Sequence, residues 1–239
     1  MRLSWDDVSQ RDYRVGVDRG VLYPYINDEY LEGVAWNGLV GVDGNEQGHE
    51  KTALYSGGFL SRLLFTSDEH SGTIRCYNYP PEFERCIGAR EIASGLYAYN
   101  QEYDPFGFCY RVNVGNASDG ADSSYEIHLV YNAYITNLKF NAETLSSSLK
   151  PSEMAFEYVS IPEPFRSYRP LSHLIVSAKS FGIDNTLYLE SLLYGSEDAA
   201  PRLPMPDELV DLFPTKEWNF YPSHALFPSD ENIMAHIDQ

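Results

Sequence analysis

Residues 108–135, FCYRVNVGNASDGADSSYEIHLVYNAYI, decide the fold that the sequence predicts. Apolar or aromatic residues alternate with others through residues 108–114 and again through 125–135, which is the two-residue period of a strand. The segment between them, residues 115–124, has almost no apolar content. This pattern predicts a β-hairpin with an exposed loop.

Further strands are predicted on both sides of this hairpin. They cover residues 34–42, 59–65, 73–79, 153–161 and 171–178. We expect residues 59–65 and 73–79 to pair around a long tip, and the glycine-rich residues 43–51 to form a loop.

Helices are expected in three places. Residues 80–88 have Pro81 for the first turn, Gly88 as a stop, and a short apolar face formed by Phe83, Cys86 and Ile87. Residues 184–194 form a longer helix, in which Asp184 serves as cap and Gly195 as an αL stop, and residues 206–213 form a shorter one.

The composition supports a mainly β protein with a substantial core. Of 239 residues, 43% are hydrophobic, and the 19 Tyr and 12 Phe favour strands. The net charge of −18 argues against a protein that grips nucleic acid or adheres to anionic membranes. No signal peptide or membrane span is visible, and Cys76, Cys86 and Cys109 indicate reduced, buried thiols in a protein made in a cytoplasm.

Residues 4–42 have a composition that suits contact between proteins better than chemistry. This stretch combines glycines with aromatic and basic side chains, namely Trp5, Tyr13, Arg14, Arg19, Tyr23 and Trp36. Such side chains are enriched at protein interfaces. We therefore expect these six residues to lie at a subunit interface, with the arginines forming intersubunit ion pairs.

Candidate chemical sites are weak. Glu126 and His128 share one strand face, but a zinc site needs three or four ligands, and the other histidines are dispersed and expected to be exposed or singly bonded. Carboxylate pairs such as Glu102/Asp104 arise by chance among 35 acidic residues. No nucleophile elbow, Walker sequence or dinucleotide glycine pattern occurs, so neither catalysis, a cofactor nor a metal is expected.

Seven short motifs together resemble the major tail tube proteins of long, non-contractile-tailed bacteriophages. They are YRVGVDRGVLYP (13–24), GVAWNGL (33–39), TIRCYNYP (73–80), FGFCYR (106–111), EIHLVY (126–131), LLYG (192–195) and PRLPMP (201–206). The resemblance implies a β-sandwich or barrel with one or two short flanking helices over residues 1–213. Residues 214–239 match no family pattern and are expected to be a separate C-terminal extension.

The resemblance also implies a function without enzyme activity or cofactor. Such proteins form hexameric rings that stack into a hollow virion tube around a tape measure protein. The tube meets tail tip and terminator proteins and later lets double-stranded DNA pass. Assembly would take place in the bacterial host cytoplasm.

Three hypotheses follow from this reading. Glu126, Glu153 and Glu157 are candidates for an acidic lumen that repels phosphates. The arm of residues 4–24 and the loop of residues 42–51, with Asn45 and His49, are candidates for contacts between rings. The C-terminal extension, with Trp218, is a candidate docking arm. The main alternative is a glycan-binding β-sandwich that stacks exposed aromatics on sugars, and an enzyme is a distant third.

Overall fold

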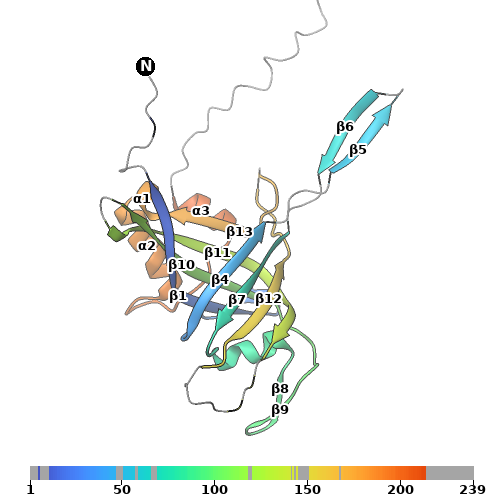
Figure 1. Ribbon diagram of the computed structural model, residues 1–239, viewed down its shortest axis with the longest axis vertical. Helices are drawn as coiled ribbons and strands as arrows, with labels where there is room; N and C mark the ends of the chain where they lie inside the picture. Colours follow the sequence, from blue (N-terminus) through green and yellow to red (C-terminus); the bar gives the residue numbers. More distant parts are fainter. Residues whose placement is uncertain are drawn as a thin grey trace, which may run out of the picture.

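The computed structural model describes residue 5 and residues 11–46, 51–56, 59–65, 69–117, 120–140, 142, 144, 151–166 and 168–213. In this part of the chain antiparallel strands dominate, accompanied by three short α-helices and a 3-10 helix (Figure 1). The prediction of a mainly β fold with short helices is confirmed. None of the described helices is both long and apolar enough to cross a membrane.

Three long antiparallel strands form the centre of the main sheet: β1 (Asp12–Ile26), β10 (Phe106–Asn116) and β11 (Gly120–Lys139). The predicted hairpin is thus confirmed as β10–β11, with strands that extend into the expected loop. Each face carries buried neighbours: Leu22, Phe108 and Val130 on one, and Val21, Cys109 and Leu129 on the other. The central strands therefore have a hydrophobic core on both sides.

β1 corrects the expectation that residues 4–24 are an arm. From Asp12 onward this segment is a 15-residue strand paired with β10. Its alternation is interrupted by two shifts in pairing register, between Val15 and Val17 and between Asp18 and Val21. Gly16 and Arg19, at φ 70° and 48°, lie at these shifts. Because each shift changes which residues face the core, the two-residue period is hidden in the sequence.

The main sheet divides along β11. Its other strands are β2 (Glu29–Tyr30), β3 (Val34–Ala35), β4 (Leu39–Glu46), β7 (His70–Cys76), β12 (Met154–Ser160) and β13 (His173–Ser177). Residues 126–130 of β11 pair with β13, whereas residues 133–139 pair with β12, which is followed by β7 and β4. The predicted strands 153–161 and 171–178 are confirmed as β12 and β13.

The β12–β7–β4 branch curls back toward β1. The Trp36 N–H, between β3 and β4, donates to the Gly20 carbonyl of β1 at 2.8 Å. A Cβ atom at Gly20 would lie only 3.0 Å from Cδ2 of Leu39, so a glycine allows this close approach. The result is a barrel-like half of the molecule.

The first core fills this curl, and the 3-10 helix η2 (Pro81–Ile87) covers it. Phe83 is fully buried, with its ring centroid 4.6 Å from that of Trp36 and 5.1 Å from that of Phe156. Gly88 ends the helix at φ 66°, in the left-handed region. The prediction for residues 80–88 is confirmed, with the helix in the tighter 3-10 form.

The second core lies between the opposite face and the helices α1 (Ala178–Phe181), α2 (Ile183–Tyr194) and α3 (Pro206–Leu212). The predicted helices of residues 184–194 and 206–213 are confirmed, but their ends differ. Gly182, not Asp184, is the N-cap of α2, and no side chain caps it. Gly195 follows the helix at φ 79° and ψ 171°, a positive-φ conformation that favours glycine but lies outside the αL region.

Two small hairpins project at opposite ends of the molecule (Figure 1). One joins β5 (Lys51–Ser56) and β6 (Phe59–Phe65), and the other joins β8 (Arg90–Ala93) and β9 (Leu96–Ala98). The predicted pairing of residues 59–65 with 73–79 is wrong, because β6 pairs with β5 while β7 pairs with β4 and β12. The Gly-Gly sequence at residues 57–58 is the hairpin signal that the prediction missed.

Candidate assembly surfaces

The aromatic residues that were expected at an interface separate into two groups. Trp5 is 77% exposed, and Tyr13 is also exposed at the start of β1. Tyr23 and Trp36, however, are buried, so for them the expectation of a surface role is wrong. The Tyr23 hydroxyl donates to the Leu193 carbonyl at 2.7 Å, and Trp36 Nε1–H donates to the Asn78 carbonyl at 2.9 Å. Their polar atoms are thus satisfied inside the chain.

The arginines of β1 also have partners within the chain. Arg14 donates two hydrogen bonds to Glu126, at 2.6 and 2.9 Å. Arg19 Nη1 lies 3.2 Å from the Glu190 carboxylate on α2, and its guanidinium lies 5.5 Å from the centroid of the Tyr194 ring. Carboxylates of the same chain thus already neutralise both arginines, and their intersubunit ion pairs stay a prediction.

Three further predicted contact residues lie at the margins of the described chain. Asn45 belongs to β4, where its backbone pairs with Ser71 of β7. His49 and Trp218 lie outside the described residues. Residues 43–46 and 51 of the predicted loop are in strands β4 and β5, and residues 47–50 lie outside the described residues.

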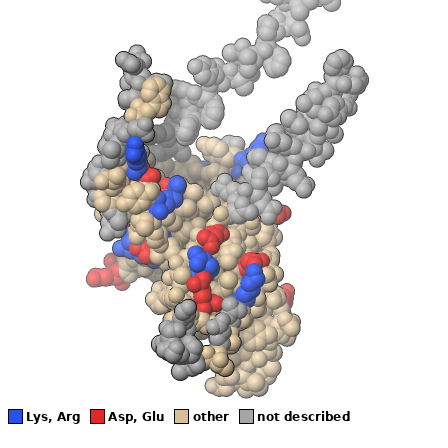
Figure 2. Space-filling view, in the orientation of Figure 1, with Lys and Arg blue, Asp and Glu red and all other residues tan. Residues whose placement is uncertain are grey.

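Two predicted lumen carboxylates lie on one exposed surface, which we call the ion-pair face. Its members are Asp43, Arg75, Lys139, Glu153 and Glu157. Arg75 binds Asp43 at 3.0 Å and Glu153 at 3.3 Å, and Lys139 binds Glu157 at 2.6 Å. Figure 2 shows acidic and basic side chains gathered in small mixed groups over this side of the sheet. The surface is mixed in sign rather than strongly acidic.

Glu126 lies elsewhere. It is on the half of β11 that pairs with β13, and only 15% of its side chain is exposed. Both of its carboxylate oxygens accept from Arg14. Glu126 therefore does not share a surface with Glu153 and Glu157, and its charge is largely compensated.

An apolar surface that the sequence analysis missed surrounds the β8–β9 hairpin. We call it the β8–β9 end; its members are Ile92, Leu96, Tyr97, Tyr99 and Tyr103. Ile92 is 69% and Leu96 56% exposed. Beside it Tyr99, Tyr103 and Phe140 line a hollow of about 390 Å³. Clustered exposed side chains of this kind mark a contact surface.

Three histidines that the sequence analysis treated as separate meet in the interior. His70, His128 and His173 come from β7, β11 and β13, where the sheet divides. The His173 ring stacks on His70 at a centroid distance of 4.1 Å and on His128 at 5.1 Å. His128 Nδ1 lies 3.0 Å from His173 Nε2, and His70 Nε2 lies 3.0 Å from the Tyr158 hydroxyl. The expectation that the histidines other than His128 are dispersed is wrong for His70 and His173, which both lie against other histidines.

This His stack favours neutral imidazoles. Burial lowers the pKa of His70 and of His128 to about 4, and burial together with the other two histidines lowers the pKa of His173 to about 3. The hydrogen bond between two rings also requires that one nitrogen accept. The rings lie face to face. Among the described residues, no group of three or more His, Cys, Asp or Glu side chains could hold a metal ion.

The cysteines are packing residues. Cys76, Cys86 and Cys109 are buried and free, as the sequence predicted. Burial raises the pKa of Cys76 to about 11 and those of Cys86 and Cys109 to about 12. Thiols with such pKa values are protonated near neutral pH, which makes them poor nucleophiles.

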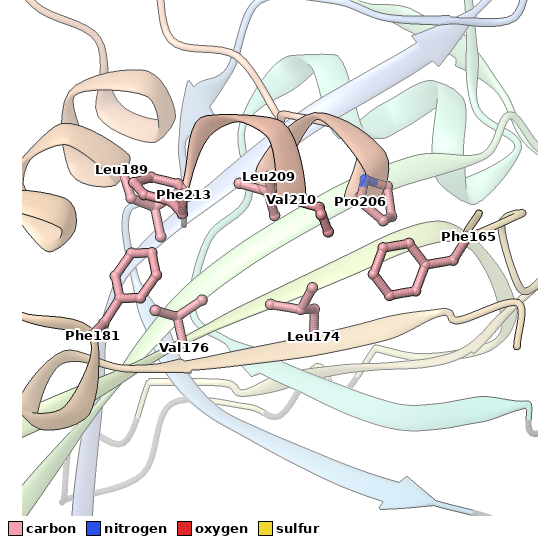
Figure 3. A pocket seen from close by; sticks show the side chains of 9 residues that line it. All are labelled: Phe165, Leu174, Val176, Phe181, Leu189, Pro206, Leu209, Val210 and Phe213. Atoms are coloured by element: carbon pink, nitrogen blue, oxygen red, sulfur yellow. The ribbon is translucent and has the colours of Figure 1, made fainter. Parts of the chain in front are cut away.

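A second apolar hollow lies between α3 and β13. We call it the α3 groove; its nine lining residues are labelled in Figure 3, and its volume is about 220 Å³. Leu209 and Val210 reach into it from α3, and Leu174 and Val176 face them from β13. Phe213, the last described residue, also lines it.

No known protein family and no curated protein matches the sequence. Among solved structures, the chain is similar to one in the PVC sheath–tube complex of an extracellular contractile injection system in the extended state. Identity is 12% and the TM-score 0.39, over 74% of this chain and 99% of that chain. A chain in the cap that terminates the anti-feeding prophage tube has 14% identity and a TM-score of 0.39, over 74% and 100%. A chain in the anti-feeding prophage baseplate has 13% and 0.33, over 67% and 94%. All three likenesses are distant.

Proposed function

We propose that the chain is a structural subunit of a phage-tail-like tube. In this proposal copies of the chain form hexameric rings that stack into a hollow virion tube, and the sequence motifs favour the long, non-contractile type. The observation that carries the proposal is the difference between the two ends of the molecule. The β5–β6 hairpin projects from one end, and the apolar β8–β9 end lies at the other (Figure 1).

Unlike ends support head-to-tail association. A contact between two different surfaces leaves one surface of each kind free on every pair of copies, so further copies can add. The repeated contact gives a ring when the rotation closes and an open filament when it does not. The β5–β6 hairpin forms a sheet of its own, and no described strand of the main sheet pairs with it. A hairpin that projects in this way, opposite an exposed apolar surface, fits a contact made with the next copy.

The ion-pair face supports a channel through which DNA passes without being held. Duplex DNA binds where free Lys and Arg side chains neutralise phosphates. Here Arg75 and Lys139 are already bound by carboxylates. We propose that this face lines the lumen around the tape measure protein, and that Glu153 and Glu157, together with Asp43, act by binding the two cations.

The test of this proposal is a single substitution at the β8–β9 end. In Leu96→Asp a charge replaces an exposed apolar contact residue, so the protein should fold normally but form few or no tubes in negative-stain images. Ile183→Asp is the matched control, because Ile183 is also exposed but belongs to α2 and to neither hairpin. Wild-type protein that stays monomeric at every concentration would contradict the proposal, as would undiminished tubes from Leu96→Asp.

A glycan-binding module is the second candidate. The observation that favours it is the hollow of about 390 Å³ where Tyr99 and Tyr103 lie beside Asn100, since aromatic faces with a polar neighbour suit sugar stacking. Saccharide-induced chemical-shift changes confined to these residues, in a protein that does not assemble, would favour this candidate over a tube subunit.

A further inference from the structure

The α3 groove is an apolar surface that the described chain leaves unfilled. Four of its lining residues, Phe165, Leu174, Phe181 and Val210, are only partly buried although all are apolar. Figure 3 shows Phe165 and Phe181 at opposite ends of the hollow, with α3 on one side and β13 on the other. Filling it would remove apolar surface from water, which stabilises a complex.

The groove is preformed by contacts at its rim. Arg166, next to Phe165, forms hydrogen bonds to the carboxylate of Asp211 on α3, and its Nε lies 3.6 Å from Asp207. These contacts hold the Phe165 segment against α3. A hollow whose walls are already in place requires little further ordering when a side chain enters it.

The sequence that follows the groove contains side chains of the right kind. Phe213 lines the groove, and 26 residues follow it (239 − 213), PTKEWNFYPSHALFPSDENIMAHIDQ. Four of them are aromatic: Trp218, Phe220, Tyr221 and Phe227. Aromatic residues are uncommon in segments whose role is only to be solvated.

The geometry at Phe213 favours the groove of another copy over the segment's own. Phe213 has an extended backbone, with φ −121° and ψ 133°, and Pro214 follows it. A residue before proline stays extended, which disfavours an immediate reversal into the adjacent groove. A chain of 26 residues can span up to about 85 Å, which is enough to reach a neighbouring copy.

We propose that residues 214–239 of one copy dock on a neighbouring copy and that Trp218 enters its α3 groove. The proposal rests on the self-association proposed above and deepens it, because it assigns a donor segment and an acceptor site to one of the contacts. The indole ring brings a large apolar area at a small entropic cost, which suits a hollow of this size and lining.

Cross-linking between two isotopic forms of the full-length chain tests the docking. Trp218 is replaced by p-benzoylphenylalanine in ¹⁵N-labelled protein, which is mixed with unlabelled protein, assembled and irradiated. We expect cross-linked peptides that join labelled position 218 to unlabelled residues of the α3 groove. Products that join position 218 only to the groove of its own labelled chain would overturn the proposal, and so would the absence of groove products.

Substitutions in the groove supply the second measurement. Val210→Asp, in which a charge occupies a partly exposed lining position, should lower the yield of mixed-isotope product about tenfold. Leu187→Asp is the matched control, because Leu187 is an exposed residue of α2 outside the groove, and it should leave the yield unchanged. If Val210→Asp fails to fold, Trp218→Ala replaces it, with tube length and stability under dilution as the measured quantities.

The outcomes separate this proposal from the tube itself. Tubes without the mixed-isotope product overturn the docking and leave the proposed function intact. Protein that neither forms tubes nor yields the product overturns both. Mixed-isotope product in small oligomers without tubes supports the docking and contradicts the tube.

Discussion

At the scale of residues, the His stack makes stability depend on pH. His70, His128 and His173 are neutral when folded and ionise near 6.5 when unfolded, so between about pH 6.5 and 4 the unfolded chain binds more protons. The contribution of these histidines to the free energy of unfolding is therefore fully present above pH 6.5 and is lost as the pH falls below that value. Arg14 and Glu126 are the charged neighbours at one end, and Tyr110 and Tyr158 pack against the stack.

Urea unfolding at a series of pH values measures this effect. Each imidazole should contribute a slope of up to about 1.4 kcal/mol per pH unit within that range. His173→Phe should reduce the slope, because it removes one titrating ring and keeps an aromatic of similar shape. His236→Phe, outside the described residues, is the control. A free energy of unfolding that is constant from pH 7 to pH 5 would refute the effect.

Two ion pairs of different burial test how much burial adds to the contribution of an ion pair to stability. Asp18 accepts two hydrogen bonds from Arg111, at 2.6 and 2.7 Å, and Arg111 also lies over the Tyr125 ring at 4.7 Å. Only 16% of the Arg111 side chain is exposed, so Asp18→Asn should cost about 1–3 kcal/mol. Asp43→Asn changes a carboxylate that is 68% exposed, and should cost less than about 0.5 kcal/mol. Equal effects in chemical denaturation would contradict this ranking.

At the scale of elements, η2 stabilises the first core through one side chain. Phe83→Ala should cost about 3–5 kcal/mol, because it leaves a cavity among Trp36, Phe106 and Phe156. Tyr77→Ala, at an exposed position nearby in sequence, should cost far less and serves as control. A similar loss of melting temperature for both would show that η2 is not needed to close the core.

The β5–β6 hairpin should be dispensable for folding and necessary for assembly. Replacing residues 51–65 by a short Gly-Ser linker removes strands that pair only with each other among the described residues. The melting temperature of the monomer should then be unchanged, while sedimentation should show no large assemblies. A large fall in melting temperature would contradict this separation of roles.

The sequence predicted elements well where the apolar period is regular and failed where it is interrupted. β10, β11, β12 and α2 follow from alternation or from leucine spacing. β1 was missed because its register shifts at Gly16 and Arg19 reverse the pattern.

Pairing partners and candidate surfaces were harder to predict. Which strand pairs with which depends on tertiary packing, so β5–β6 was missed. Whether an aromatic residue belongs to a contact surface or to the core depends on the exposure of its side chain. The composition of a segment does not predict that exposure. Trp36 and the β8–β9 end were misjudged for this reason.

At the scale of the whole molecule, the proposal that the ion-pair face lines the lumen predicts how assembled copies interact with DNA. Replacing Asp43 by Asn and both Glu153 and Glu157 by Gln removes the carboxylates that bind Arg75 and Lys139, and so frees both cations for phosphate. We expect tubes of this variant to retain duplex DNA at low salt and to release it as salt rises, because counterion release drives such binding. DNA retention equal to that of wild-type tubes in a filter-binding assay would show that this face does not line the lumen.

The central claim is that identical copies stack head to tail. Electron cryomicroscopy of the assembled wild-type protein tests it most directly. We expect a hollow tube of stacked six-fold rings in which the β5–β6 hairpin of one copy contacts the β8–β9 end of a copy in the next ring. Particles that remain monomeric, or closed two-fold dimers that pair the same surface of both copies, would contradict it.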